Sequence, residues 1–323
     1  TVGIQYIVDG IMTVGELTAF IGYISNTLSN FVAGTQKLLE RMPYMKQSLN
    51  RFNYFLNLDE YKKDGKSLEK INTIEVKHLS YWYDNTEKPA LDNINMTIHN
   101  GDKIGIIGQV GSGKTTLMNI ISGFYEIPEG MVLINGEDIG KYKKDDLFSK
   151  YNYALQQNII LDDTIKANVD ITENLNDKEF EKIIKNAELQ EDIKKLEEKE
   201  DTLVGEKGVK LSGGQKQRVS IARNLSNARD INIFDDTLSA LDSITEKKIM
   251  NNLLKEVGDN TVIVISNKIS SVEKLNKIYV LLDGKIEDCG THEELLERNE
   301  FYKEVYMLEK KEEEDEIYTK EEY

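Results

Sequence analysis

The 323-residue chain has one cysteine and three histidines, and basic side chains are in the minority. A single cysteine, Cys289, excludes a disulfide within the chain and fits a reducing compartment. Lysine and arginine number 41 against 57 aspartate and glutamate, a net charge of −16, so a nucleic-acid surface is not suggested. No secretory signal is visible, and the first residue is Thr1 rather than methionine. The length suits one large α/β domain and something smaller, and we expect a fragment whose N-terminal part is missing.

Strongly apolar membrane segments are also scarce. The segment most similar to a membrane helix is residues 17–36, which are twenty residues without a charge but include several Ser, Asn, Thr and Gly. They could span a bilayer, although a soluble amphipathic helix is an equally good interpretation. The basic residues Lys37, Arg41, Lys46 and Arg51 follow, and they would place the C-terminal side of a spanning helix in the cytoplasm. Such a helix would need partner helices outside this chain to shield its polar side chains from lipid.

One stretch fits the phosphate-binding pattern G-x-x-x-x-G-K-[ST]. An apolar run at 103–107 precedes it and is typical of a buried strand, while residues 116–121 look like the first turns of a helix. Strand, glycine loop and helix are the context that this motif requires. Backbone N–H groups of such a loop surround phosphates at the positive end of the helix. The predicted nucleotide-binding residues of the loop are Gly108, Gln109, Val110, Gly111, Ser112, Gly113, Lys114, Thr115 and Thr116.

Two side chains of this loop have predicted individual roles. Lys114 would reach the β- and γ-phosphates of the nucleotide, and the Thr115 hydroxyl would bind Mg²⁺. Upstream, the aromatic residues 81–83 have strand spacing, which is most often typical of a sheet face. One of them could instead stack on an adenine ring.

The rest of the chain alternates apolar runs with charged helical patterns. Strands are predicted at 74–79, 94–98, 131–134, 231–234 and 261–265, and helices with charged outer faces within 176–200. The segment 59–72 is polar and charged, as expected for a linker. The last fifteen residues carry eight acids and three lysines, which predicts a solvated, partly disordered tail.

The phosphate loop alone fits many nucleotide-hydrolysing families, and the segment Leu211-Ser212-Gly213-Gly214-Gln215 reduces their number sharply. With it, the chain resembles the ATP-binding domain of ABC transporters over residues 74–308. In that family LSGGQ lies at a helix N-terminus and contacts the γ-phosphate of ATP held by the partner subunit. A serine hydroxyl, two glycines and a helix dipole suit an anion. The resemblance therefore assigns Ser212, Gly213, Gly214 and Gln215 to ATP binding across a dimer.

The resemblance implies roles for further positions. Tyr83 resembles the aromatic residue that stacks on adenine, and Asp235 the residue that supports Mg²⁺. Gln157 resembles the glutamine that links Mg²⁺ to the membrane domain, although the following segment is one residue short and Gln156 remains an alternative. Ser239 and Asp242 fall in the loop that crosses to the partner site.

Two segments resemble the exporter branch of the family. Residues 202–208 match T-x-V-G-E-x-G, which contacts coupling helices through Glu206. Residues 13–58 resemble the last membrane helix of an exporter and its cytoplasmic extension. A half-transporter of this branch has about six membrane helices, so most of that domain would be missing here.

Two positions depart from the family pattern. Asp236 stands where the family usually has a glutamate that acts as general base, and Asn267 stands where it usually has a histidine. The aspartate side chain is one methylene shorter than glutamate, which moves its carboxylate by about 1 Å. Such a shift can lower the rate of hydrolysis on the order of a hundredfold. Asparagine can donate a hydrogen bond to a γ-phosphate but cannot become positively charged. We expect Asp236, Asn267 and Gln157 to be the catalytic positions of a site that binds ATP well and hydrolyses it poorly.

The predicted fold class is α/β: an ABC-type, P-loop ATP-binding domain with a helical subdomain, preceded by a transmembrane and cytoplasmic-extension helix. The predicted parts are a membrane-domain fragment at 1–58, a linker at 59–73, the ATP-binding domain at 74–308 and an acidic tail at 309–323. The cofactors implied by the resemblance are ATP and Mg²⁺, with Mg²⁺ held near Thr115, Gln157 and Asp235.

The resemblance predicts one half of a heterodimeric exporter at the cell membrane, with its ATP-binding domain on the cytoplasmic side. Expected partners are a second half-transporter, the coupling helices of the membrane domains and an unknown exported substrate, with no nucleic acid. A homodimeric exporter and a soluble ABC protein without a transport role remain alternatives. The motif at 202–208 argues against the soluble protein.

Overall fold

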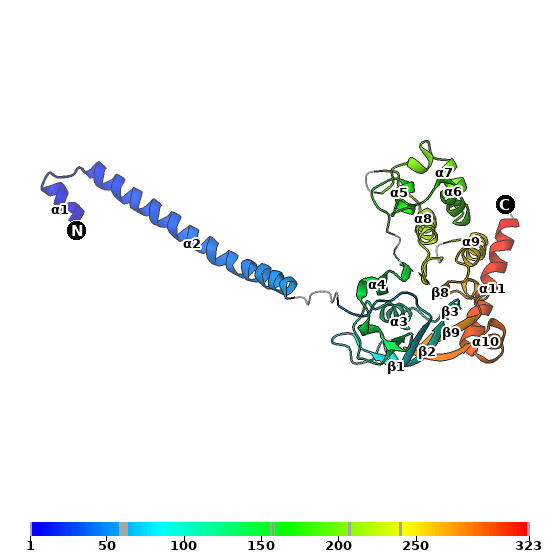
Figure 1. Ribbon diagram of the computed structural model, residues 1–323. Helices are drawn as coiled ribbons and strands as arrows, with labels where there is room; N and C mark the ends of the chain where they lie inside the picture. Colours follow the sequence, from blue (N-terminus) through cyan, green and yellow to red (C-terminus); the bar gives the residue numbers. More distant parts are fainter. Residues whose placement is uncertain are drawn as a thin grey trace. The chain divides into compact units, whose positions relative to one another are not determined.

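The structure is a computed structural model, which describes residues 2–57, 64–155, 157, 159–205, 208–238 and 241–321. The chain divides into two units, Thr1–Tyr61 and Lys62–Tyr323 (Figure 1). In its described residues the first unit contains the helices α1 (Val2–Val8) and α2 (Val14–Leu56). A capping box starts α2: Glu16 N–H donates to Thr13 Oγ1 (3.2 Å), and Thr13 N–H donates to the Glu16 carboxylate (2.8 Å). The helix predicted at 17–36 therefore forms, and it continues through the predicted cytoplasmic extension.

The hydropathy of α2 falls short of the expectation for a membrane helix. Among the described residues, no helix joins the length and the apolarity that crossing a membrane requires. Ser25, Asn26 and Asn30 are among the polar residues that lower the mean hydropathy of this part of α2. The prediction of a helix is confirmed, whereas hydropathy does not support the prediction that residues 17–36 span a membrane.

The second unit is built on a six-stranded sheet with the strand order β10-β9-β3-β8-β7-β6. All neighbours are parallel except β10, which pairs antiparallel with β9. Strands β7 and β8 are buried along their whole length, which explains why their sequences are mainly apolar. The strands are β3 (Lys103–Ile107), β6 (Tyr151–Ala154), β7 (Ile231–Asp235), β8 (Thr261–Ser266), β9 (Lys277–Leu282) and β10 (Lys285–Gly290).

A smaller antiparallel sheet has the order β2-β1-β4-β5. Its strands are β1 (Thr73–Tyr81), β2 (Leu91–His99), β4 (Val132–Ile134) and β5 (Glu137–Asp138). Leu68 and Ile71, from the predicted linker, are buried in the same core as β1 and β2. The second half of that segment is therefore part of the second unit, while residues 58–63 lie outside the described residues.

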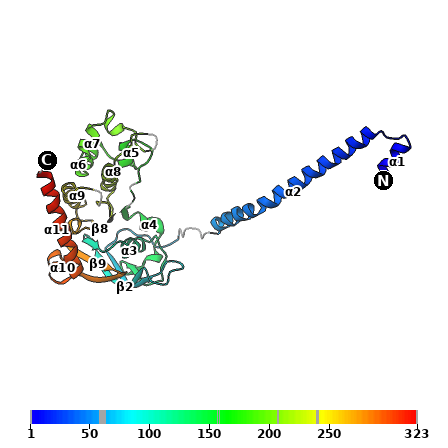
Figure 2. The same ribbon diagram turned by 180° about the vertical axis from the view of Figure 1, so that it is seen from behind.

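Helices α5 to α8 gather at one end of the second unit (Figures 1 and 2), where α8 also contacts β6, and they form the helical subdomain expected from the sequence. The α-helices that follow the first sheet strands are α3 (Lys114–Ile121), α4 (Lys144–Phe148), α5 (Ile165–Val169), α6 (Asp177–Asn186), α7 (Gln190–Lys194), α8 (Gly213–Ser226), α9 (Ser243–Glu256), α10 (His292–Arg298) and α11 (Glu300–Glu321). Three short 3₁₀ helices are η1 (Ile139–Lys141), η2 (Lys199–Asp201) and η3 (Ile269–Ser271).

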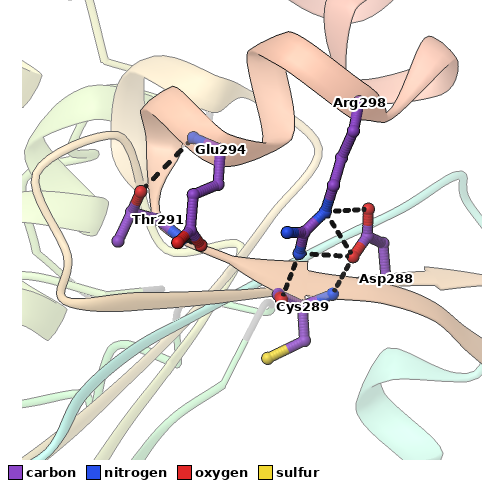
Figure 3. A network of polar contacts seen from close by, with 5 residues as sticks. All are labelled: Asp288, Cys289, Thr291, Glu294 and Arg298. Atoms are coloured by element: carbon purple, nitrogen blue, oxygen red, sulfur yellow. Dashed lines mark hydrogen bonds and ion pairs between the residues drawn. The ribbon is translucent and has the colours of Figure 1, made fainter.

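A polar network holds α10 against the edge strand β10 (Figure 3). Arg298 donates to Asp288 Oδ1 (2.8 Å) and to the carbonyl oxygen of Cys289 (2.7 Å). The hydrogen bond from Arg298 lowers the pKa of Asp288. Thr291 Oγ1 accepts from the Glu294 N–H (3.3 Å) and caps the helix. Because α11 begins directly after α10, this network fixes where the C-terminal helix starts.

The C-terminal helix differs from the predicted tail. Helix α11 continues to Glu321, across the predicted boundary at 308/309. Its Glu- and Lys-rich sequence has good helix propensity, which the expectation of partial disorder neglected. Glu309, the first residue of the predicted solvated tail, is half-buried against the domain.

Candidate nucleotide site

A cavity of about 300 Å³ opens where β3, β7 and β8 end. Because these strands are parallel neighbours, their carboxyl ends meet at one edge of the sheet, where ligands bind in open α/β sheets. The residues that line the cavity are Tyr83, Ala90, Val110, Gly111, Gly113, Lys114, Thr115, Thr116, Asp235, Asp236 and Asn267. The structure thus brings together most residues of the predicted loop, the predicted aromatic residue and both departures from the family pattern.

The glycine loop has a shape that side chains would fill. Gly111 and Gly113 have φ of +84° and +100°, in the left-handed region that favours glycine. A Cβ at Gly113 would lie 2.6 Å from the carbonyl oxygen of Ala90, whereas the corresponding space at Gly111 is open. Ser112 is buried, and its hydroxyl has no hydrogen-bond partner within the described residues. The open glycine cradle at the N-terminus of α3 fits a phosphate group, whereas the Ser112 hydroxyl does not line the cavity.

These two glycines give a matched test of the loop. Gly111→Ala should cost about 1 kcal/mol of unfolding free energy, because only the left-handed backbone is strained. Gly113→Ala should cost about 3 kcal/mol, because it adds overpacking against Ala90 to the same strain. Urea denaturation of both variants measures the difference, and equal losses would contradict the close approach of Ala90.

Lys114 is the cation of the cavity and is half-buried. Its Nζ donates to the carbonyl oxygens of Gly108 (2.7 Å) and Gln109 (2.8 Å) and to Asn267 Oδ1 (3.0 Å). Burial lowers the pKa of Lys114, and the carboxylates of Asp235 and Asp236 oppose that shift. The ammonium group therefore lies between the loop carbonyls, where it could also meet a phosphate.

Asp235 and Thr115 supply adjacent oxygen atoms. Asp235 is only 3% exposed, and burial raises the pKa of its carboxyl, while hydrogen bonds from Thr115 and Tyr153 lower it. The Tyr153 hydroxyl donates to Asp235 Oδ2 (3.2 Å). A hydroxyl and a carboxylate are hard oxygen donors of the kind that Mg²⁺ prefers, so this pair fits the predicted metal position.

Asp236 lines the cavity with an unusual backbone. Its φ is +50°, and its N–H donates to the carbonyl oxygen of Ile265 (2.9 Å), which ties the end of β7 to β8. Aspartate and asparagine tolerate this left-handed conformation better than most residues. The carboxylate that replaces the family's glutamate therefore has a local conformational reason to fit here.

Tyr83 belongs to a cluster of three tyrosines. Its ring packs edge-on against Tyr81 at 5.3 Å, and Tyr81 stacks on Tyr125 at 5.6 Å. The Tyr83 hydroxyl hydrogen-bonds Thr116 Oγ1 (2.8 Å), and the ring is 41% exposed at the cavity. The cluster holds a ring beside the phosphate loop, where an adenine could stack on it.

The LSGGQ residues lie elsewhere in the fold. Ser212 is the N-cap of α8, where its hydroxyl accepts from the Gln215 N–H (3.3 Å), and Gln215 Oε1 accepts from the Ser212 N–H (2.9 Å). Gln215 also donates to Asp192 (3.1 Å). Ser212 and Gly213 are exposed, and Ser212, Gly213, Gly214 and Gln215 do not line the cavity. This separation fits a role toward a nucleotide held by another chain.

The other predicted positions do not line the cavity or lie outside the described residues. Gln157 is exposed and does not line the cavity, so its predicted roles in catalysis and metal binding remain predictions. Gln156, Glu206 and Ser239 lie outside the described residues. Asp242 caps α9, where its carboxylate accepts from the Thr245 N–H (3.0 Å).

The sequence reasoning missed Ala90, Tyr125 and Tyr153. Tyr153 comes from β6 and Tyr125 from the loop after α3, and neither belongs to a recognisable motif. Only the strand order brings Tyr153 beside Asp235.

Comparison with known proteins supports the resemblance. Residues 91–239 match the family model described as ABC transporter. A Staphylococcus aureus protein (strain NCTC 8325 / PS 47) described as a multidrug export ATP-binding/permease protein is 34% identical over 312 residues, 95% of this chain and 54% of that protein. The protein of strain bovine RF122 / ET3-1 has the same identity and coverage. The chain spans about half the length of these curated relatives.

A solved structure is also similar. The structure of a bacterial Atm1-family ABC exporter with ATP bound has a TM-score of 0.74 and 28% sequence identity, over 82% of this chain and 47% of that chain. The predicted α/β, ABC-type fold with a preceding long helix and the predicted resemblance to ABC exporters are confirmed. The second unit therefore contains an ATP-binding domain of the ABC transporter type, which the family model matches over residues 91–239.

Proposed function

We propose that this chain is part of a dimeric ABC exporter, in which ATP binding and hydrolysis drive export of an unidentified substrate across a membrane. One observation carries the proposal: Lys114, Asp235, Asp236 and the glycine loop line a single cavity at the sheet edge. The transport part is supported by the relatives, which are described as multidrug export ATP-binding/permease proteins.

ATP would occupy the cavity with its phosphates inside the glycine loop. Backbone N–H groups at the start of α3 and the Lys114 ammonium would bind the β- and γ-phosphates. Tyr83 would stack on adenine. Thr115 and Asp235 would hold Mg²⁺, which when bound neutralises phosphate charge, with Gln157 as a further ligand from the loop after β6.

Hydrolysis at this cavity would be slow. Asp236 would orient the attacking water and accept its proton, but its carboxylate reaches about 1 Å less far than that of a glutamate. Asn267 Oδ1 accepts from Lys114. Because an amide is neutral, Asn267 cannot supply the positive charge of an imidazolium. Both side chains weaken the same step, in which charge builds up on the γ-phosphate.

The partner would complete the opposite site. Ser212 and Gly213 are exposed at the N-terminus of α8 and would contact the γ-phosphate of ATP bound to a second half-transporter. The slow site of this chain and a competent site on the partner would be unequal. Unequal sites imply a heterodimer in which hydrolysis occurs mainly at the partner's phosphate loop. A homodimer with two active sites is the alternative, and the placement of the Asp236 carboxylate in the same cavity as Lys114 favours it.

The full chain is expected to bind MgATP and to hydrolyse it very slowly. Binding is measured by calorimetry with MgATP, and turnover by phosphate release. Turnover should lie roughly a hundredfold below the enzyme median of about 10 s⁻¹, because Asp236 is short and Asn267 is neutral. A chain that binds no MgATP would contradict the proposed site, and turnover near the median would contradict only its slow hydrolysis.

Localisation provides an independent check of the transport role. A membrane protein with the ATP-binding domain on the cytoplasmic side should sediment with membranes when cells that express the parent protein are fractionated. Recovery of that protein only in the soluble fraction would instead favour an ABC protein without a transport role.

A further inference from the structure

The turn that follows Asn267 is held by carboxylates from two other helices. Residues Ile269–Ser271 form η3, whose first N–H groups have no acceptor inside so short a helix. Its N-cap residue, Lys268, makes no side-chain capping bond. Instead, Glu309 of α11 accepts from the Ile269 N–H (2.6 Å) with one carboxylate oxygen and from the Ser270 N–H (3.1 Å) with the other. A side chain 40 residues away therefore caps this turn.

The second carboxylate acts on the same turn from α9. Glu246 is 1% exposed, and its Oε1 accepts from the hydroxyls of Ser270 (3.3 Å) and Ser271. The Ser271 hydroxyl in turn accepts from Ser266 (3.3 Å), at the end of β8. Glu246 thus fixes the hydroxyl side of the turn, and Glu309 fixes its backbone side.

Asn267 lies between two residues whose backbone is held in place, Ser266 at the end of β8 and Ile269 in η3. Before it, Ser266 is buried in β8, and after it the Lys268 N–H donates back to Ser266 Oγ (2.9 Å). Ile269, which Glu309 caps, is fully buried in the core on which Val305 and Tyr306 of α11 also pack. Because Asn267 is itself exposed and contacts Lys114 through Oδ1, its direction depends on where the buried neighbours hold the backbone.

We propose that Glu309 is a positioning residue for the nucleotide site: by capping η3, it holds Asn267 in the orientation that contacts Lys114 and the γ-phosphate. The inference rests on the proposed function, since it requires ATP in this cavity. It assigns to the C-terminal helix a part in distinguishing ATP from ADP. Burial raises the pKa of the Glu309 carboxyl and the two N–H donors lower it, as expected for a carboxylate enclosed by the groups it caps.

The anchoring of α11 makes such a role mechanically reasonable. The Tyr302 N–H donates to Asn299 Oδ1 (2.8 Å), and the Tyr302 hydroxyl hydrogen-bonds His292 Nδ1 (2.9 Å). Tyr302 is fully buried, so the first turns of α11 are fixed to α10 and through it to β10. Glu309 therefore reaches the turn from a rigid support.

The test compares MgATP with MgADP, which differ only in the γ-phosphate. Calorimetry on the full chain gives both dissociation constants for the wild type, Glu309→Ala, Glu309→Gln and the matched control Glu304→Ala, an exposed glutamate of the same helix. We expect Glu309→Ala to weaken MgATP roughly tenfold, within the usual range of coupling between sites, and to leave MgADP unchanged. Glu309→Gln keeps one acceptor and should fall between, and Glu304→Ala should match the wild type.

A double-mutant cycle separates positioning from simple support of the fold. If Glu309 acts through Asn267, the double variant Asn267→Ala/Glu309→Ala should bind MgATP no worse than Asn267→Ala alone. Additive losses, or equal weakening of MgATP and MgADP by Glu309→Ala, would overturn the inference and leave the proposed function intact. A wild-type chain that binds neither nucleotide would overturn the proposed function itself.

Discussion

Replacement of Lys114 by alanine is expected to abolish MgATP binding at this chain's cavity without unfolding the domain. The Lys114 ammonium group lies among the loop carbonyls, and Lys114 is the only lysine or arginine among the described residues that line the cavity. Removing one partner of a desolvated, hydrogen-bonded charge pair costs about 3 kcal/mol or more, which is a hundredfold or more in Kd. Calorimetric titration of the full-length variant with MgATP measures the loss.

Stability should change little in the same variant. The acceptors that Lys114 leaves behind are the carbonyls of Gly108 and Gln109 and the amide of Asn267. Gln109 and Asn267 are exposed, so water can replace the ammonium at these two acceptors. Lys255→Ala, at an exposed position of α9, is the matched control for loss of one positive charge. Undiminished affinity in Lys114→Ala would mean that the phosphate-loop assignment is wrong, whatever its effect on stability.

The centre of the site could be predicted because its signals are local. The glycine loop is one uninterrupted segment, and its chemistry follows from residue types at fixed spacing. Asp235 and Asn267 were predicted from the family resemblance. Each of them follows an apolar strand, and the parallel strands β7 and β8 bring these ends to one edge of the sheet. A short list of motifs thus anticipated most of the cavity lining.

What the sequence did not reveal depends on contacts between distant residues. Lys114 is half-buried because Asn267, 153 positions later, supplies one of its acceptors. Tyr153 reaches Asp235 only because β6 and β7 are neighbours in the sheet. Glu309 caps η3 although the charged segment that it begins indicates only solvation. No local pattern encodes these pairings.

For the N-terminal helix, the sequence predicted the secondary structure but not what surrounds it. The lack of charge from Leu17 to Gln36 was sufficient to indicate a helix, which the structure contains. Hydropathy cannot decide what covers its side chains, because polar residues are tolerated in a membrane helix that faces other helices. In its described residues the first unit offers α2 no other covering element than α1.

The second large effect is expected at the composite sites of the assembled exporter. If the dimer has unequal sites, Gly213→Leu should remove most ATP hydrolysis by the complex, whereas Asp236→Asn should remove little. Gly213 would contact ATP held by the partner, whose site carries the turnover, and Asp236 would act on ATP held here. A loss of about a hundredfold at the competent site is typical when one donor to developing charge is blocked.

Both substitutions suit the local structure, so a loss would not reflect misfolding. No atom of the described residues lies within 4 Å of a Cβ at Gly213, so the leucine points into open space in this chain. Asparagine at Asp236 tolerates the same positive φ and removes only the charge. Ser212→Ala is less decisive, because it also removes the N-cap of α8, which is worth about 1 kcal/mol.

The measurement is ATP hydrolysis by the parent complex purified from membranes with either variant subunit, at equal amounts of folded protein. In a homodimer each substitution is present at both sites, and the two variants should be similarly impaired. A strong loss from Gly213→Leu with a weak loss from Asp236→Asn would therefore support the heterodimer. Equal losses would favour the homodimer, and a larger loss from Asp236→Asn would assign the slow site to the partner instead, because hydrolysis would then depend on the carboxylate that lies beside Lys114 in this chain.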